Sequence, residues 1–179
     1  VPGLLVMITC FPFLVTVLSI LRQGIGLQQA PPNMLIVTLA LFLTYFVMEP
    51  VFMTAWETGI SPLVEGSLEA EEAVPLALAP FREFMAARID PDTFEALATL
   101  RPLDASESLA PTSPLSMLVP SFLLSEIERA FQVGFLVFLP FLIIDLVVAA
   151  ILMSMGMMMV PPAIVSLPFK LTFFAVADG

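Results

Sequence analysis

The chain has 179 residues, 59% of them hydrophobic, and a mean hydropathy of +1.03, which excludes a water-soluble globule and indicates an integral membrane protein. Its formal charge of −10 is local, because residues 57–107 hold eleven of the sixteen acids and three of the six bases. The absence of histidine and the single cysteine exclude disulfide frameworks, zinc sites and cysteine–histidine catalysis, and no stretch is basic enough for nucleic acid. Cys10, in an apolar run, is expected to be a small buried hydrophobe.

Residues 1–56 are predicted to form a first hydrophobic helical hairpin. Leu4–Leu21 carries no charge and is about long enough to cross a bilayer, with Pro12 as a kink. The glycines, prolines and amides of Arg22–Asn33 predict a turn. Met34–Met48 is too short to cross alone, but a helix that continues to Trp56 reaches the length required. Because the chain starts and stops at apolar runs, we expect a removed leader or a fragment.

Residues 57–120 are predicted to form an acidic extramembranous insert. The segment holds eight of the seventeen prolines, and it has no apolar run long enough to span a membrane. Two stretches have helical patterns and start with proline, Pro80–Arg88 and Pro91–Leu100. The acidity, with few bases beside the membrane helices, favours the periplasmic side under the positive-inside rule.

Residues 121–179 are predicted to form an amphipathic helix that leads into a second hydrophobic hairpin. In the amphipathic part, residues 121–134, Glu126 and Arg129 are spaced to pair on one face, which is either solvated or an intersubunit contact. Asp145 is the only ionisable group of the following apolar stretch, residues 134–153, and its nearest base in sequence is Arg129. An aspartate within a membrane costs about 2.5–3.5 kcal/mol, so we expect it to face a partner helix, a polar cavity or a proton pathway.

A glycine, three methionines and two prolines interrupt the second hairpin between two strongly apolar arms. Gly156, Pro161 and Pro162 predict a hinge, since the proline pair removes backbone donors and is tolerable in a membrane only where protein or water surrounds it. Met157, Met158 and Met159 predict a deformable apolar collar, because the unbranched thioether adapts to irregular partners. The break therefore indicates an assembly or a pore, and we interpret it as the functional centre.

The fold class that follows is an all-α membrane protein, with four hydrophobic helical segments in two hairpins and a proline-rich acidic helical insert between them. No catalytic constellation or phosphate-binding loop is present, so we predict neither an enzyme nor a cofactor or metal. Ser166 and Lys170 have the residue types of a serine–lysine dyad, but Pro168 distorts the turn between them, and an interfacial lysine is the preferred interpretation. Three classes remain: an export gate or channel subunit, favoured by the broken helix; a secondary transporter, although repeats are not visible; and an accessory assembly protein.

Several motifs together resemble the FliP family of flagellar type III secretion export-gate proteins, whose near relatives are the injectisome SctR proteins. They are LRQGIGLQQAPPN at 21–33, LALFLTYFVMEP at 39–50, FQVGF at 131–135, IIDLV at 143–147, MGMMMVPP at 155–162 and LPFKL at 167–171. The match covers both hydrophobic pairs and leaves the acidic insert in the family's variable region.

The resemblance implies a multi-pass protein of the bacterial inner membrane, at the core of the flagellar basal body. It implies several copies that form, with FliQ and FliR type subunits, a closed channel for unfolded flagellar proteins. Export-apparatus proteins of the FlhA and FlhB types would be further partners, independently of FliA. Met157, Met158 and Met159 match the family's methionine gasket around the pore, and Glu126 and Asp145 match acidic positions implicated in assembly and function. The injectisome subunit is the alternative, and a secondary transporter a more distant one.

Overall fold

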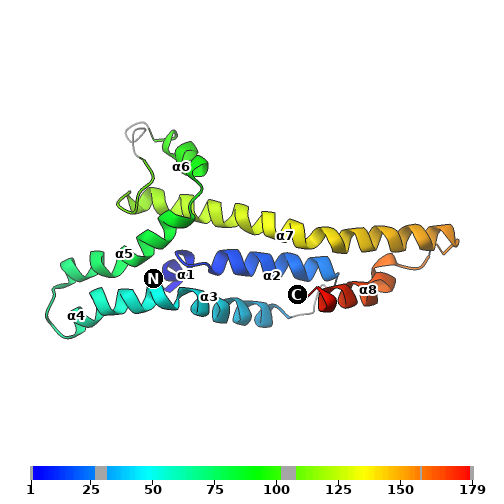
Figure 1. Cartoon of the computed structure of the whole chain (residues 1–179), viewed down its shortest axis with the longest axis horizontal. Coiled ribbons are helices and arrows are strands. Elements are labelled where there is room, and N and C mark those ends of the chain that lie inside the picture. The colour runs from blue at the N-terminus through cyan, green and yellow to red at the C-terminus, as the bar shows by residue number, and fades with distance from the viewer. Residues whose placement is uncertain (1, 27–31, 102–107, 158, 178–179) are drawn as a thin grey trace. The chain divides into compact units, whose positions relative to one another are not determined.

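The computed structural model describes residues 2–26, 32–101, 108–157 and 159–177, and every regular element within these ranges is helical (Figure 1). In chain order the elements are α1 (Pro2–Met7), α2 (Phe11–Ile25), α3 (Asn33–Ala55), the π-helical turn η1 (Trp56–Ile60), α4 (Ser61–Val64), α5 (Ala70–Arg88), α6 (Pro91–Ala98), α7 (Leu115–Ser154) and α8 (Pro162–Val176). The all-α prediction is therefore confirmed for this part of the chain. The arrangement of four segments in two membrane hairpins stays a prediction.

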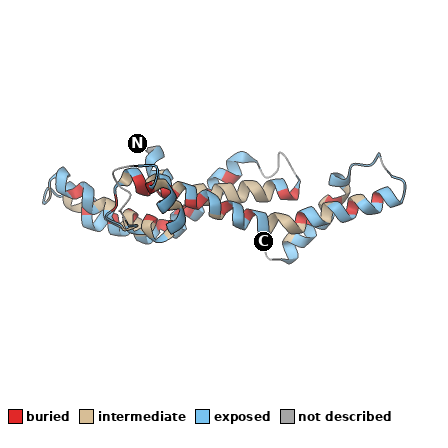
Figure 2. Cartoon of the chain, turned by 90° about the horizontal axis from the view of Figure 1, so that it is seen from above, coloured by how far each residue is buried: buried red, intermediate tan, exposed pale blue. Residues whose placement is uncertain are grey.

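Two stretches of helix are long and apolar enough to cross a membrane, judged by length and composition. They are residues Asn33–Val64 and Leu115–Ser154, whose most apolar 18-residue windows have mean hydropathies of 2.0 and 2.9. Only 22% and 17% of their most apolar windows are buried, and exposed residues follow one another along the helices in Figure 2. Apolar surface on this scale requires lipid or other protein chains to cover it.

The first apolar segment is broken where a single kinked helix over Leu4–Leu21 was expected, so that prediction is wrong. α1 ends at Met7 and α2 starts at Phe11. The hydroxyl of Thr9 donates to the carbonyl of Val6 over 2.6 Å, which satisfies the end of α1 locally. Pro12 has no backbone N–H and therefore suits the first turn of a new helix better than a helix interior. The predicted turn 22–33 includes residues 27–31, which lie outside the described residues.

α3 confirms that the second segment continues past Pro50 to Trp56, where the π-helical turn η1 begins. Gly59 in η1 explains how closely this segment meets α5. A Cβ atom added to Gly59 would lie 2.6 Å from the backbone nitrogen of Ala77 and 2.8 Å from the carbonyl oxygen of Ala73. Only a residue without a side chain fits at this separation.

The predicted helix over Pro80–Arg88 exists but starts ten residues earlier, at Ala70, so the expected proline start is wrong. Glu71 and Glu72 lie in its first turn, where carboxylates interact favourably with the helix dipole, and α5 accommodates both Pro75 and Pro80 in its interior. α6 does start with proline, at Pro91. Its N-cap Asp90 accepts a hydrogen bond from the backbone N–H of Asp92, as is typical of a capped N-terminus.

The chain divides into two compact units, which we describe separately. The first comprises Val1–Leu14 and Leu39–Arg129, and the second Val15–Thr38 and Ala130–Gly179. The core of the first unit confirms the expected burial of Cys10, which is 3% exposed. The buried members of this core are Ile8, Cys10, Met48, Ala55, Phe81, Met85, Ile89, Phe94, Ala98, Met117, Leu118 and Phe122.

A buried hydroxyl in the first unit gives a testable prediction. The Ser121 side chain is fully buried, and its oxygen has no hydrogen-bond partner among the residues that the structure describes. An unsatisfied buried polar group costs about 1–3 kcal/mol. We therefore expect Ser121→Ala to leave the free energy of unfolding unchanged or to raise it, measured by thermal unfolding in detergent. The matched control is Ser125→Ala, which removes the acceptor for the Asp90 N–H at 2.9 Å and should destabilise the protein.

Candidate functional site

The predicted functional centre is the connection between α7 and α8 in the second unit, and its geometry follows from glycine and proline. α7 ends at Ser154, and Gly156 has a φ of +79°, a conformation that L side chains rarely adopt. The N–H of Gly156 donates to the Met153 carbonyl over 3.1 Å, and the N–H of Met157 to the Leu152 carbonyl over 2.8 Å. These are the two hydrogen bonds of a Schellman motif, which stops a helix while satisfying its last carbonyls.

The next helix starts at the predicted proline pair. Pro161 is the N-cap of α8 and Pro162 its first residue, where the missing N–H costs nothing. The hinge residues Gly156, Pro161 and Pro162 therefore lie at the two ends of one connection. Their function as a moving hinge stays a prediction.

Methionine side chains are exposed on this connection. Met155, Met157 and Met159 are 62%, 44% and 95% exposed; we call these three residues the methionine loop. Met158 lies outside the described residues. The exposed thioethers would suit an apolar collar, but the pore-gasket function predicted for Met157, Met158 and Met159 stays a prediction.

A charge pair between Asp145 and Lys170 connects α7 to α8. A carboxylate oxygen of Asp145 lies 2.7 Å from Nζ of Lys170, and its other oxygen accepts a hydrogen bond from the Ser166 hydroxyl over 2.6 Å. The side chain of Lys170 is 2% exposed and that of Asp145 is 34% exposed. Asp145 therefore faces a partner helix, α8, which is the first of the three predicted alternatives.

The interfacial position expected for Lys170 is wrong, because its ammonium group is buried against that carboxylate. Ser166 and Lys170 both point to Asp145 and so share an acceptor, which is not the arrangement of a serine activated by a lysine base. The sequence did not predict this pair, because Arg129 is nearer to Asp145 along the chain than Lys170 is. The signal was one acid and one base in two apolar arms, at similar separations from the break.

The Lys170 ammonium is also close to the end of α2 in the same unit. A Cβ atom added to Gly26, which follows α2 with a φ of +89°, would lie 3.2 Å from Nζ of Lys170. Cations are favoured near the C-terminal end of a helix, where carbonyl groups lack partners. The ammonium of Lys170 in α8 therefore pairs with α7 and lies beside the C-terminal end of α2.

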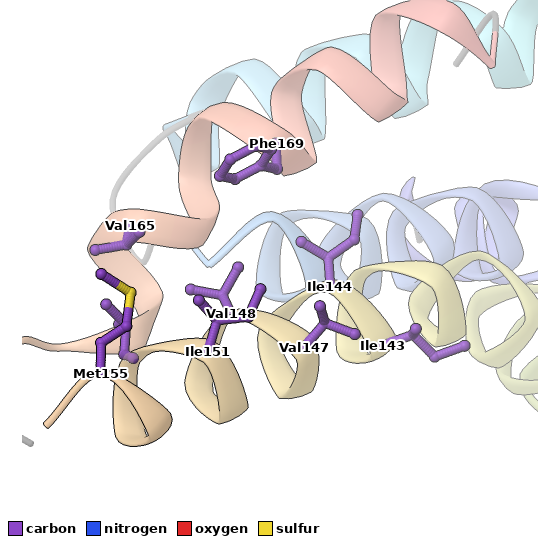
Figure 3. A pocket seen from close by; sticks show the side chains of 9 residues that line it. Ile143, Ile144, Val147, Val148, Ile151, Met155, Val165 and Phe169 are labelled. Atoms are coloured by element: carbon purple, nitrogen blue, oxygen red, sulfur yellow. The ribbon is translucent and has the colours of Figure 1, made fainter. Parts of the chain in front are cut away.

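Apolar contacts continue the α7–α8 pairing on both sides of this charge pair. The rings of Phe141 and Phe173 meet edge to face, with centroids 5.8 Å apart. Toward the methionine loop, an open groove of about 470 Å³ lies between the helices, and Figure 3 shows Met155 beside Val165 of α8. All of its lining residues are apolar: Ile143, Ile144, Val147, Val148, Ile151, Leu152, Met155, Val165 and Phe169.

Glu126 of α7 is the second predicted polar residue, and it belongs to the first unit. Its side chain is fully buried, and its two carboxylate oxygens lie 2.7 and 3.1 Å from Nε and Nη2 of Arg88 in α5. Arg129 adds a weaker contact at 3.4 Å to Glu126 and donates to the Arg88 carbonyl over 2.9 Å. The Arg88 guanidinium in turn lies 5.6 Å from the ring centroid of Phe13 and of Phe84.

The solvated face predicted around Glu126 is therefore wrong. Ser125 and Glu126 are buried, while the apolar Ile127 and Phe131 are exposed. Arg88 and Asp90, more than 30 residues earlier in the insert, supply the groups that hold these two polar side chains inside. Helical periodicity identifies the two faces of this helix but not which face turns inward.

Comparison with known proteins gives the same family over the whole chain. The model of the FliP family matches residues 1–179. A flagellar biosynthetic protein FliP of Caulobacter vibrioides is 48% identical over 178 residues, which are 99% of this chain and 66% of that protein. The proteins of the same name from Rhizobium meliloti and Bacillus subtilis are 46% and 44% identical over 99% of this chain, covering 73% and 80% of their own lengths. The chain belongs to the FliP family.

Proposed function

We propose that the chain is a subunit of the flagellar type III protein export gate. In this proposal it lies in the bacterial inner membrane at the flagellar basal body, where several copies and FliQ and FliR type subunits enclose a closed channel. Unfolded flagellar proteins pass through this channel, in cooperation with FlhA and FlhB type proteins, and the role of the chain is structural and not enzymatic. The relatives named above are flagellar proteins, which favours the flagellar over the injectisome system.

The observation that carries the proposal is the methionine loop on its hairpin. Its backbone is held at one end by the Schellman motif and at the other by Pro161, and Met157 and Met159 are 44% and 95% exposed. Long unbranched side chains on a fixed frame can close a narrow opening and still move aside for an extended polypeptide. A ring of such loops would act as a seal against small solutes.

The apolar helix faces support an assembly. Residues such as Leu136, Ile143 and Leu146 of α7 are 57–68% exposed, and they continue along a helix that also carries the methionine loop. Neighbouring copies or lipid must cover these side chains in a membrane. Because the charges of Asp145 and Lys170 are paired within the chain, this outer face of α7 can pack against a neighbour without a charged group.

Shortening the gasket tests the proposal. We expect Met157, Met158 and Met159 replaced together by alanine to leave assembly intact and to raise the leakage of small solutes several-fold, since each alanine removes the flexible part of the side chain. The measurement is dye efflux from vesicles that contain the full-length, assembled gate. Met153→Ala is the matched control, because Met153 is 62% exposed on α7 but lies before the loop. Unchanged leakage in correctly assembled triple-alanine complexes would contradict the gasket.

A further inference from the structure

The C-terminal end of α2 lies against two of the contacts that join α7 to α8 in the second unit, and it has a glycine at each of them. At the aromatic contact, a Cβ atom added to Gly24 would lie 3.1 Å from Cδ2 of Phe141, whose ring meets that of Phe173 in α8. At the charged contact, a Cβ atom added to Gly26 would lie 3.2 Å from Nζ of Lys170. Real Cβ atoms seldom come this close to other atoms, so a side chain at either glycine would press on the pairing of α7 with α8.

The Lys170 ammonium has little freedom to yield to such a side chain. It lies 2.7 Å from one carboxylate oxygen of Asp145, and the other oxygen accepts a hydrogen bond from the fully buried Ser166. The end of a lysine side chain moves easily when it is surrounded by water, but this one is 2% exposed. A displacement would weaken the ion pair and leave a poorly compensated charge in the interior, which is costly.

The backbone at Gly26 places the end of α2 beside this cation. Its φ is +89°, and its N–H donates to the carbonyls of Arg22 and Gln23 over 3.3 and 3.0 Å, so α2 ends there. The carbonyl end of a helix favours a positive charge. A substitution at Gly26 would have two separate effects: backbone strain from the positive φ, and contact of the new side chain with the ammonium.

We propose that Gly26 is a positioning residue for the charge pair between Asp145 and Lys170, and that the end of α2 thereby holds α8 in place on α7. Because Gly26 has no side chain, the ammonium can lie between the carboxylate and the end of α2. The part of this inference that concerns export rests on the proposed function, since α8 begins at Pro162, directly after the methionine loop. The positioning itself can be tested without any assay of export.

The reactivity of Lys170 reports on its position, because it is the only lysine among the 179 residues. The full-length protein in phospholipid vesicles is treated with acetic anhydride, and acetylation of the peptide that contains Lys170 is followed by mass spectrometry. We expect Lys170 to be protected in the wild type, where its side chain is 2% exposed, and to be acetylated several-fold faster in Gly26→Ala.

Gly66→Ala is the matched control for backbone strain. Gly66 has a similar φ, +77°, but a Cβ atom added to it would meet nothing within 4 Å. The control therefore introduces similar strain without a contact to Lys170. Equal protection of Lys170 in Gly26→Ala and Gly66→Ala would overturn the inference.

A double-mutant cycle separates contact from strain at Gly26 itself. In the background Asp145→Leu, Lys170→Leu the ammonium is absent, so Gly26→Ala should lower the midpoint of thermal unfolding no more than Gly66→Ala does. With the charge pair present, Gly26→Ala should lower the midpoint more than Gly66→Ala. A loss of the same size in both backgrounds would overturn the inference, as would failure of Gly26→Ala to fold in both.

Motility and secretion test the part that concerns export. We expect Gly26→Ala to lower both several-fold and Gly66→Ala to leave them close to wild type. Lowered export with Lys170 still protected would overturn the inference, because the substitution would then act elsewhere. If Lys170 becomes reactive and export is unchanged, the positioning role of Gly26 stands, and the proposed role of the α7–α8 pairing in export fails.

Discussion

We expect Asp145→Leu to abolish most protein export and Asp145→Asn to preserve part of it. Asp145→Leu leaves the Lys170 ammonium, 2% exposed, without its counter-charge, and breaking a buried pair in this way costs about 3–5 kcal/mol. The exposed third of the Asp145 side chain reduces this cost by admitting water. Asparagine can still accept from the Lys170 ammonium with its oxygen and donate its amide N–H to the Ser166 hydroxyl, so it keeps hydrogen bonds between α7 and α8.

The matched measurement is motility and secretion of the single variants beside the double variant Asp145→Leu, Lys170→Leu. Because the double variant removes both charges, it should recover thermal stability relative to Asp145→Leu. If asparagine proves as damaging as leucine while the protein still assembles, the charge itself or a proton on it is required, and the explanation by hydrogen bonding is wrong. If the double variant is no more stable than Asp145→Leu, the pair does not account for the packing of the two helices.

The second large effect is expected at Arg88. Arg88→Met leaves the fully buried carboxylate of Glu126 with only the 3.4 Å contact to Arg129, so we expect a loss of about 3–5 kcal/mol in the free energy of unfolding. Arg129→Met is the matched control at the same carboxylate. It removes the longer contact and the hydrogen bond to the Arg88 carbonyl from a side chain that is 38% exposed, and together these should cost about 1–2 kcal/mol.

Chemical or thermal unfolding of the purified protein gives the free energy of unfolding of both single variants. The same measurement is made on the double variant Arg88→Met, Glu126→Gln. The neutral amide removes the unpaired buried charge, so it should restore part of the stability lost in Arg88→Met. Equal losses in the two single arginine variants would show that the bidentate contact is not the main support of Glu126. Which arginine stabilises the Glu126 carboxylate more can therefore be decided without any assay of export.

Helical segments were predictable from the sequence wherever their pattern is local. The extension of α3 past Pro50 and the break before α8 follow from hydrophobic length and from proline chemistry, both of which act over a few residues. The interruption at Thr9 and the early start of α5 were missed. The first depends on a side-chain hydrogen bond. The second involves a tertiary contact, because the first half of α5 packs closely against η1 at Gly59.

The polar part of the site was predictable only in its residue types. Asp145 and Glu126 stand out because charges are rare on apolar helices, but their partners Lys170 and Arg88 lie 25 and 38 residues away in sequence. Distance along the sequence pointed to Arg129 as the partner of both acids. In the structure Arg129 makes only the longer, 3.4 Å contact to Glu126. Long-range pairing depends on how helices return along one another, which periodicity does not specify.

α7 is longer than the hydrocarbon layer of a membrane is thick. Forty residues at 1.5 Å each make a rod of about 60 Å, while the hydrocarbon layer is about 30 Å thick. The most apolar 18-residue window of α7 has a mean hydropathy of 2.9, whereas Glu126, Glu128 and Arg129 lie in the first half of the helix. A bilayer can therefore cover only part of α7. The charged half is enclosed by this chain itself, since Met117 and Phe122 lie in the core of the first unit. The acidic insert thus supplies protein cover for the length of α7 that exceeds the lipid.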